Sequence, residues 1–139
     1  MEEYREKITS DTLLIGHSIA CAFILDVLEL MHVSVRACFL TAGWTGPLHD
    51  PEFDSINATI AQRTFDWSKI KARAKRFYVI NAVDDPYVPF ALGVTLAHNV
   101  GTSVIPVEKG GHFNEEAGYR EFPMLLAKIV EELETKDTV

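Results

Sequence analysis

A serine, an acid and a histidine occur in this order along the chain, each beside small or turn-forming residues. Ser18 lies in the segment GHSIA (16–20), Asp85 lies in DDP (84–86), and His112 follows two glycines. A serine hydroxyl is a weak nucleophile at neutral pH, so an imidazole must accept its proton before it attacks a carbonyl. A carboxylate then holds the imidazole in the required tautomer and stabilises its protonated form. These residue types therefore predict nucleophilic acyl-transfer chemistry.

Each of these residues also has a purely structural interpretation. A glycine, a serine and a further glycine or alanine at two-residue spacing occur together in roughly one chain in ten of this length. A serine that caps a helix would explain Ser18. An acidic turn that caps the next helix would explain Asp84 and Asp85, and a glycine turn with a surface histidine would explain His112. The secondary structure around each residue decides between the two interpretations.

The elements that must position these residues alternate between strands and helices. Short apolar or β-branched runs predict strands at 12–15, 33–40, 77–80 and 102–107. The pattern predicts helices at 2–8, 18–31, 89–99 and 121–134, and two shorter ones that Asp54 and Asp66 would cap, through residue 60 and over 67–74. Gly101 is expected just past a helix end, and Pro106 on an edge strand. Such alternation predicts an α/β fold, with a parallel sheet of about four strands and helices on both faces, as one domain over residues 1–139.

Functional residues of such sheets gather at the carboxyl ends of the strands. Ser18, Asp85 and His112 each follow a different predicted strand. Serine, acid and then histidine is the chain order of α/β-hydrolases, and it differs from the orders of chymotrypsin-like and subtilisin-like enzymes. His17 is expected to pack beneath the turn that carries Ser18 rather than to act as the base. The context therefore favours a triad of Ser18, His112 and Asp85 over three unrelated turns.

Composition and charge argue against several other classes of protein. The net charge of −7 does not suit a nucleic-acid binder, and the basic cluster at 69–76 is expected to be the solvated face of one helix. The sequence shows no apolar run long enough for a membrane span and no secretory leader. Cys21 and Cys38 form no CxxC pair and are expected to be buried thiols of a cytoplasmic protein. No metal-binding motif is present, and three further histidines have no acidic or cysteine partner at ligand spacing: His32, His49 and His98.

The segments GHSIA, DDPYVP, GGHFN and GYREFP resemble those of small serine hydrolases of the YdeN-like and retinoblastoma-binding-protein type. The resemblance extends from about residue 12 to residue 133. It implies an α/β-hydrolase fold in which Ser18, Asp85 and His112 are catalytic. Asp85 is preferred to Asp84 because the acid of the family directly precedes the proline-containing stretch. Trp67 also matches a recurring tryptophan of that family.

The resemblance also implies a departure, because the family's domain begins with further strands and a helix that do not precede Ser18 here. Roughly the first third of the usual domain is absent. The N–H of Ile19 would be one oxyanion donor, while the loop that usually provides the second is missing, and losing one donor typically costs on the order of 10²–10³ in rate. The strand 12–15 would be an uncovered apolar edge. We therefore expect dimerisation, aggregation, or another chain or segment that supplies the missing strands.

Together these observations predict a serine hydrolase of esterase type that acts on a small ester or acyl compound and needs no cofactor or metal. Residues 43–65, which contain aromatic and turn-forming residues, are expected to form either the wall or lid of an acyl pocket or a plain crossover connection. Two alternatives to the enzyme are a protein-interaction module and a catalytically impaired fragment. The sequence contains no Leu-x-Cys-x-Glu motif, which argues against a retinoblastoma-pocket partner.

Overall fold

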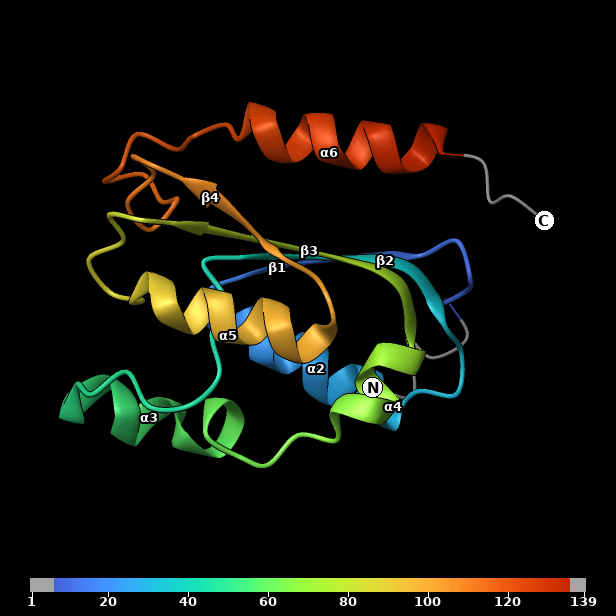
Figure 1. Cartoon of the computed structure of the whole chain (residues 1–139), viewed down its shortest axis with the longest axis horizontal. Helices are drawn as coiled ribbons and strands as arrows, with labels where there is room; N and C mark the ends of the chain where they lie inside the picture. The colour runs from blue at the N-terminus through green and yellow to red at the C-terminus, as the bar shows by residue number, and fades with distance from the viewer. Residues whose placement is uncertain (1–6, 136–139) are drawn as a thin grey trace.

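Four parallel strands form one sheet in the order β1-β2-β3-β4 in the computed structural model, which describes residues 7–135 (Figure 1). The strands are β1 (Leu13–His17), β2 (Val35–Thr41), β3 (Ala74–Ala82) and β4 (Val104–Val107). Strands that follow one another in the chain are neighbours in the sheet. Because they are parallel, each connection must run from the carboxyl end of one strand back to the amino end of the next. The helix predicted at 2–8 falls almost wholly outside the described residues, and its last two residues are not helical.

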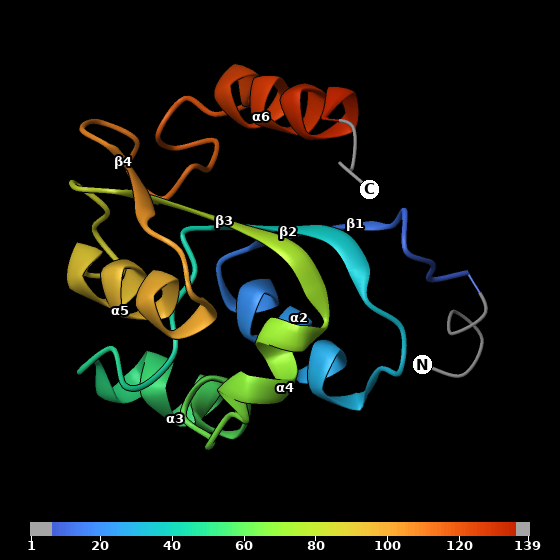
Figure 2. The same cartoon turned by 45° about the vertical axis from the view of Figure 1, so that its right-hand side comes forward.

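Helices cover both faces of this sheet, as the alternating pattern predicted. They are α2 (Ile19–Leu30), α3 (Pro51–Ala61), α4 (Trp67–Ala72), α5 (Phe90–Val100) and α6 (Pro123–Glu134). Figures 1 and 2 show α2, α4 and α5 on one face, with α3 farther from the sheet on the same side, and α6 as the one helix of residues 7–135 on the other face. The predicted α/β fold class is therefore confirmed.

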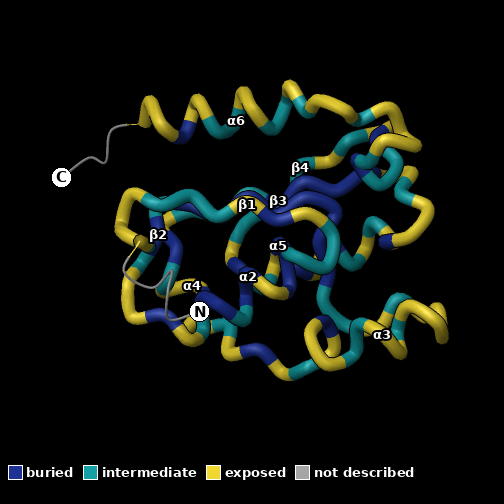
Figure 3. The backbone as a smooth tube through the Cα atoms, turned by 180° about the vertical axis from the view of Figure 1, so that it is seen from behind, coloured by how far each residue is buried: buried dark blue, intermediate teal, exposed yellow. Residues whose placement is uncertain are grey.

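The hydrophobic core is divided by the sheet into two parts. The larger part lies between the sheet and α2, α4 and α5, and its fully buried members include Leu25, Leu28, Ile70 and Leu96. The smaller part lies on the α6 side and centres on Ile80. In Figure 3 the strands β2 and β3 are mostly buried, whereas α3 and the outer side of α6 are exposed. The two central strands are thus packed on both faces, and connecting loops project from their carboxyl ends.

A buried carboxylate joins α6 to the sheet. The side chain of Glu132 is fully buried and accepts hydrogen bonds from Arg36 (Nε, 3.2 Å) in β2 and from Arg76 (2.5 Å) and the Tyr78 hydroxyl (2.7 Å) in β3. Arg36 also donates to the main-chain oxygens of Glu132 and Thr135, at 2.6 and 2.8 Å. Burial and the hydrogen bond to Glu132 raise the pKa of Tyr78 to about 12. These contacts fix α6 against the middle of the sheet.

The basic cluster at 69–76 does not lie on one helix, so that expectation was wrong. Lys69 and Lys71 belong to α4, but Lys75 and Arg76 belong to β3, which begins three residues earlier than predicted. The sequence pattern misled because residues 74–76 interrupt the apolar run, although Arg76 finds a buried acidic partner across the sheet. One member of the cluster is therefore a structural ion pair rather than a solvated charge.

Helix ends agree with the expected capping residues in two cases and differ in one. Asp66 caps α4 by accepting the Lys69 N–H at 3.1 Å, and Gly101 ends α5 with φ of 84°. The helix that Asp54 was expected to cap begins earlier, because Asp50 accepts the first two free N–H groups of α3. Asp54 instead accepts the N–H of Leu48 at 2.7 Å, which closes the loop before that helix.

The two outer strands of the described sheet are β1 and β4. Pro106 lies in β4, as expected for an edge strand. On the other side, β2 is the one strand of the described residues that pairs with β1, and Ile15 is 52% exposed. The predicted edge position of the strand before Ser18 is therefore confirmed within residues 7–135.

The described helices and both cysteines bear on two further expectations. No helix within residues 7–135 is long and apolar enough to cross a membrane. Cys21 and Cys38 are both buried and form no disulfide, and burial raises the pKa of each thiol to about 12. Neither thiol is therefore an activated nucleophile at neutral pH.

Candidate active site

Ser18 alone connects the end of β1 to the start of α2. Its backbone has φ of 59° and ψ of −129°, a conformation that costs a non-glycine residue free energy. A Cβ atom on Gly16 would lie 2.7 Å from Ile24 Cδ1 and 3.2 Å from the carbonyl group of Ala20, so only glycine allows the helix to approach the strand this closely. The turn is thus a sharp elbow that lifts the Ser18 side chain out of the sheet.

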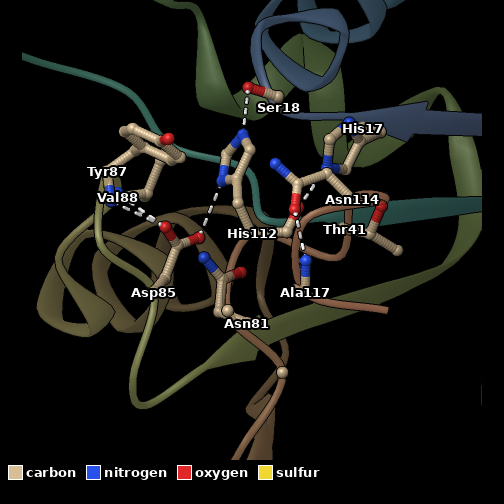
Figure 4. Close-up of polar contacts among 12 residues, drawn as sticks. His17, Ser18, Thr41, Asn81, Asp85, Tyr87, Val88, His112, Asn114 and Ala117 are labelled. Atoms are coloured by element: carbon tan, nitrogen blue, oxygen red, sulfur yellow. Dashed lines mark hydrogen bonds and ion pairs between the residues drawn. The ribbon is translucent and has the colours of Figure 1, made fainter. Parts of the chain in front are cut away.

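The Ser18 hydroxyl makes no hydrogen bond that caps α2. It lies 2.9 Å from His112 Nε2 instead, and His112 Nδ1 lies 2.9 Å from Asp85 Oδ2 (Figure 4). Because Asp85 can only accept when it is ionised, Nδ1 donates to it and Nε2 is left to accept from Ser18. The three predicted residues therefore form one chain of hydrogen bonds, in the tautomer that a general base requires.

The Asp85 carboxylate is held from two directions. Its side chain is fully buried, and its Oδ1 accepts the N–H groups of Tyr87 (2.9 Å) and Val88 (3.0 Å), while its Oδ2 faces His112. Burial raises the pKa of Asp85, but the hydrogen bonds from His112, Val88 and Tyr87 outweigh burial and hold the pKa below its ordinary value. Asp85 is therefore ionised at neutral pH and fixed in orientation. The acidic turn of the structural interpretation exists, but the same carboxylate also binds His112.

The neighbouring carboxylate, Asp84, has a different role. Its Oδ1 accepts the N–H groups of Gly110 and Gly111 at 2.8 and 2.9 Å, which are the two residues before His112. These two hydrogen bonds hold the pKa of Asp84 below its ordinary value. The structure therefore places Asp85, and not Asp84, against the imidazole.

His17 does not pack beneath the elbow, contrary to the expectation from sequence. It is exposed, and its Nε2 lies 2.7 Å from the main-chain oxygen of His112, with 4.8 Å between the two ring centroids. The error has a physical reason. The strand β1 continues through His17 rather than ending at Ile15, so Gly16 faces the core and His17 takes the opposite side. The other three histidines, His32, His49 and His98, are exposed.

A cavity of about 420 Å³ opens beside the Ser18 hydroxyl. Its wall consists of residues from four separate segments: Ser18, Phe53, Tyr87, His112, Asn114, Glu115 and Glu116. Phe53 comes from α3 and lies edge-on to Tyr87, with 6.2 Å between the ring centroids. Residues 43–65 thus contribute to the wall of this cavity. The sequence does not identify Phe53 and Tyr87 as neighbours in a site, since nothing in the local pattern shows that their segments meet.

The start of α2 lies directly beside the nucleophile candidate. Ile19 is the first residue of that helix, and the first N–H groups of a helix have no acceptor within it. The positive end of the helix dipole adds to the attraction for a negative oxygen at this point. Within residues 7–135, no group of three or more His, Cys, Asp or Glu side chains is arranged to hold a metal ion.

Comparisons with known proteins show the family and the fold. A family model described as "Serine hydrolase" matches residues 1–131. The chain is 32% identical over 126 residues to a Bacillus subtilis (strain 168) protein named "Putative hydrolase YdeN", an alignment that covers 88% of this chain and 64% of that protein. The chain therefore spans less than two thirds of the length of this relative.

Two solved structures are similar to the fold. The crystal structure of the ydeN gene product from B. subtilis has a TM-score of 0.89 and 27% sequence identity, and the match covers 96% of this chain and 72% of that one. A structure titled as a putative YdeN-like hydrolase from Pectobacterium atrosepticum has a TM-score of 0.67 at 19% identity, and covers 94% of this chain and 63% of its own. The second likeness concerns the fold alone.

Proposed function

Because this chain belongs to the serine hydrolase family, we propose that it hydrolyses small esters or related acyl compounds through Ser18, His112 and Asp85. One observation carries the proposal. The Ser18 hydroxyl and the Asp85 carboxylate each lie 2.9 Å from a different nitrogen of His112. The strained backbone of Ser18 and the lack of a capping hydrogen bond support this role. A serine that served only to cap the helix would make that hydrogen bond and would not need the strained backbone.

In the proposed reaction, Ser18 Oγ attacks the substrate carbonyl carbon while His112 Nε2 takes the hydroxyl proton. The N–H of Ile19 donates to the carbonyl oxygen as negative charge develops on it. His112 then gives its proton to the leaving alkoxide, and an acyl ester of Ser18 remains. A water molecule, deprotonated by His112, attacks the carbonyl carbon of this ester. The acyl–Oγ bond breaks, the acid is released, and His112 returns the proton to Ser18 Oγ. Asp85 keeps the ring oriented and stabilises the imidazolium in both half-reactions.

The cavity beside Ser18 supports a substrate of modest size. A volume of about 420 Å³ is at the small end of the usual range for ligand sites. Phe53 and Tyr87 offer apolar surface to an acyl or alcohol group, and no lysine or arginine is among the residues that line the cavity. We therefore propose uncharged short-chain esters as the first substrates to test. The two unpaired buried thiols also support a proposed cytoplasmic location.

The test is hydrolysis of p-nitrophenyl acetate and butyrate by the purified chain, with Ser18→Ala beside it. The expected result is turnover that Ser18→Ala reduces to the rate without enzyme. The matched control is Ser103→Ala, which changes an exposed serine in the loop between α5 and β4 and is expected to leave turnover unchanged. Equal hydrolysis by the wild type and by Ser18→Ala, or no hydrolysis by a folded wild type with either ester, would contradict the proposal. In the second case, an interaction module that retains the hydrolase fold becomes the better account.

A further inference from the structure

We propose that His17 and Asp84 are positioning residues that together hold the turn carrying His112 in register with Ser18. Each is the immediate neighbour of a residue of the proposed triad, His17 of Ser18 and Asp84 of Asp85. The two strands that present the nucleophile and the acid thus also present a second side chain to the turn of the base. The inference rests on the proposed function and adds two residues to it.

The contact from the β1 side is made by His17. Its Nε2 lies 2.7 Å from the main-chain oxygen of His112, and a carbonyl oxygen only accepts, so Nε2 carries the proton and donates. Figure 4 shows this bond reaching the His112 main chain from the strand that leads into Ser18. A single hydrogen bond therefore links the residue before the nucleophile to the backbone of the base. If the turn moved away from β1, it would have to break this bond.

The contact from the β3 side is made by Asp84. Its Oδ1 accepts both the Gly110 N–H and the Gly111 N–H, at 2.8 and 2.9 Å. Hydrogen bonds to an ionised acceptor are stronger than those between neutral groups. Asp85, the next residue, binds the imidazole of the same histidine. Two consecutive aspartates of one loop therefore bind the backbone before His112 and its ring.

The turn that carries His112, residues 110–113, is packed too closely for its backbone to take another position. A Cβ on Gly110 would lie 2.4 Å from Phe113 Cε1 and 3.0 Å from Ala82 Cβ, so the backbone is packed directly against its neighbours. The Phe113 N–H donates to the Gly110 oxygen at 3.0 Å, which closes the turn, and Phe113 has a φ of 49°. A non-glycine residue holds such a backbone only when its surroundings enforce it. The bonds from Asp84 and His17 to the same turn supply part of that enforcement.

The chemistry depends on this position because His112 must reach Ser18 and Asp85 at once. A displacement of about 1 Å at a catalytic group can lower a rate by on the order of 100-fold. Loss of either positioning contact is therefore expected to lower kcat by about 10- to 100-fold. KM is expected to stay within about twofold, since neither side chain lines the cavity beside Ser18.

The experiment compares two disruptive variants, His17→Leu and Asp84→Ala, with two conservative ones, His17→Gln and Asp84→Asn. A glutamine can donate an N–H to the His112 oxygen, and an asparagine keeps an oxygen that accepts from Gly110 and Gly111. We expect the disruptive variants to lose kcat and the conservative ones to stay within about fivefold of wild type. Rates are divided by the concentration of Ser18 that a fluorophosphonate titrates, so a merely unfolded fraction does not count as a loss of kcat.

Two outcomes would overturn the inference. One is a kcat per titrated site within twofold of wild type in both disruptive variants. The other is an equal loss of kcat in the disruptive and the conservative variants, which would show that the hydrogen bonds are not what matters.

A readout without substrate separates this inference from the proposed function. The Nδ1–H of His112, bonded to Asp85, is expected to give a downfield proton NMR signal in the wild type, assigned by its loss in His112→Ala. His17→Leu and Asp84→Ala are expected to broaden or shift this signal, and His17→Gln and Asp84→Asn to retain it. If the wild type hydrolyses nothing but the signal responds in this way, the proposed function fails and the positioning role stands. A signal identical in wild type and both disruptive variants refutes the positioning role whatever the activity.

Discussion

Replacing Asp85 with asparagine should abolish most of the proposed esterase activity while leaving the fold intact. The structure determines how the new amide would lie. Oδ1 of Asp85 accepts two main-chain N–H groups, from Tyr87 and Val88, so the asparagine oxygen must stay at that position. The amide NH₂ then takes the place of Oδ2 and points at His112 Nδ1, which lies 2.9 Å away. A donor that faces Nδ1 forces that nitrogen to accept.

The ring proton of His112 must then move to Nε2, the nitrogen that faces Ser18. An Nε2 that carries a proton cannot take another from the serine hydroxyl, so the general base is lost. The same tautomer error in a serine protease triad lowers kcat on the order of 10⁴-fold. At 1.36 kcal/mol for each factor of ten, this corresponds to about 5.4 kcal/mol in the activation barrier. The substitution changes no volume, so the thermal midpoint should move by less than about 5 °C.

The assay is kcat/KM for p-nitrophenyl acetate in Asp85→Asn, with melting followed by circular dichroism. Asp11→Asn, which alters an exposed aspartate before β1, serves as the matched control and should behave as wild type. If Asp85→Asn retains more than a tenth of the wild-type kcat/KM, the tautomer argument is wrong. If it unfolds, Asp85 supports the fold rather than the ring.

Three further predictions concern stability and assembly. Glu132→Ala should lower the free energy of unfolding, measured in urea, by about 3 kcal/mol. This is the low end for a broken buried ion pair, because the Arg36 side chain is 15% exposed. A change below about 1 kcal/mol would refute the role given to this carboxylate. The lowered pKa of Asp84 contributes stability that is present above about pH 4, the ordinary pKa of an aspartate, and is lost as the pH falls through the lowered value. The stability of Asp84→Asn should therefore decline less steeply below about pH 4 than that of the wild type, and parallel curves would contradict this. We propose that two copies of the chain pair along the edge of β1 that has no neighbouring strand within residues 7–135. Light scattering should then find a dimer that Ile15→Lys converts to a monomer, and a monomeric wild type would exclude this pairing.

The positions of Ser18, Asp85 and His112 could be anticipated because each depends on local chemistry. A glycine before a serine between a strand and a helix, and a glycine pair before a histidine, are turns whose backbone needs are visible in the residue types. The order of the three residues then limits how they can meet. The distances between these three residues depend on the whole sheet. The parallel topology nevertheless places the carboxyl ends of all four strands at the same edge.

The roles of His17 and Glu132 could not be read from the sequence, since both depend on distant residues. Whether His17 faces the core or the site depends on where β1 ends, and a shift of one residue reverses the side that it occupies. Glu132 looks like one of several solvated acids on the last helix. It is buried because Arg36, Arg76 and Tyr78, about 54 to 96 positions away, converge on it.

The capping of α3 shows the same limit at shorter range. Asp50 and Asp54 are both good capping residues, and only four positions separate them. Asp50 caps the helix because Pro51 follows it and suits the first helical position, which frees Asp54 to close the preceding loop. Two competent residues so close together leave the helix start ambiguous until the loop is known.

The most direct test of the account is whether Ser18 is a reactive nucleophile. The purified chain is incubated with a fluorophosphonate probe, and the labelled residue is identified by peptide mass spectrometry. We expect one adduct, on Ser18. His112→Ala and Asp85→Asn should slow its formation by orders of magnitude, and Ser18→Ala should remove it. A folded wild type that takes up no probe, or takes it up on another residue, would contradict the claim that Ser18, His112 and Asp85 act together as the catalytic group.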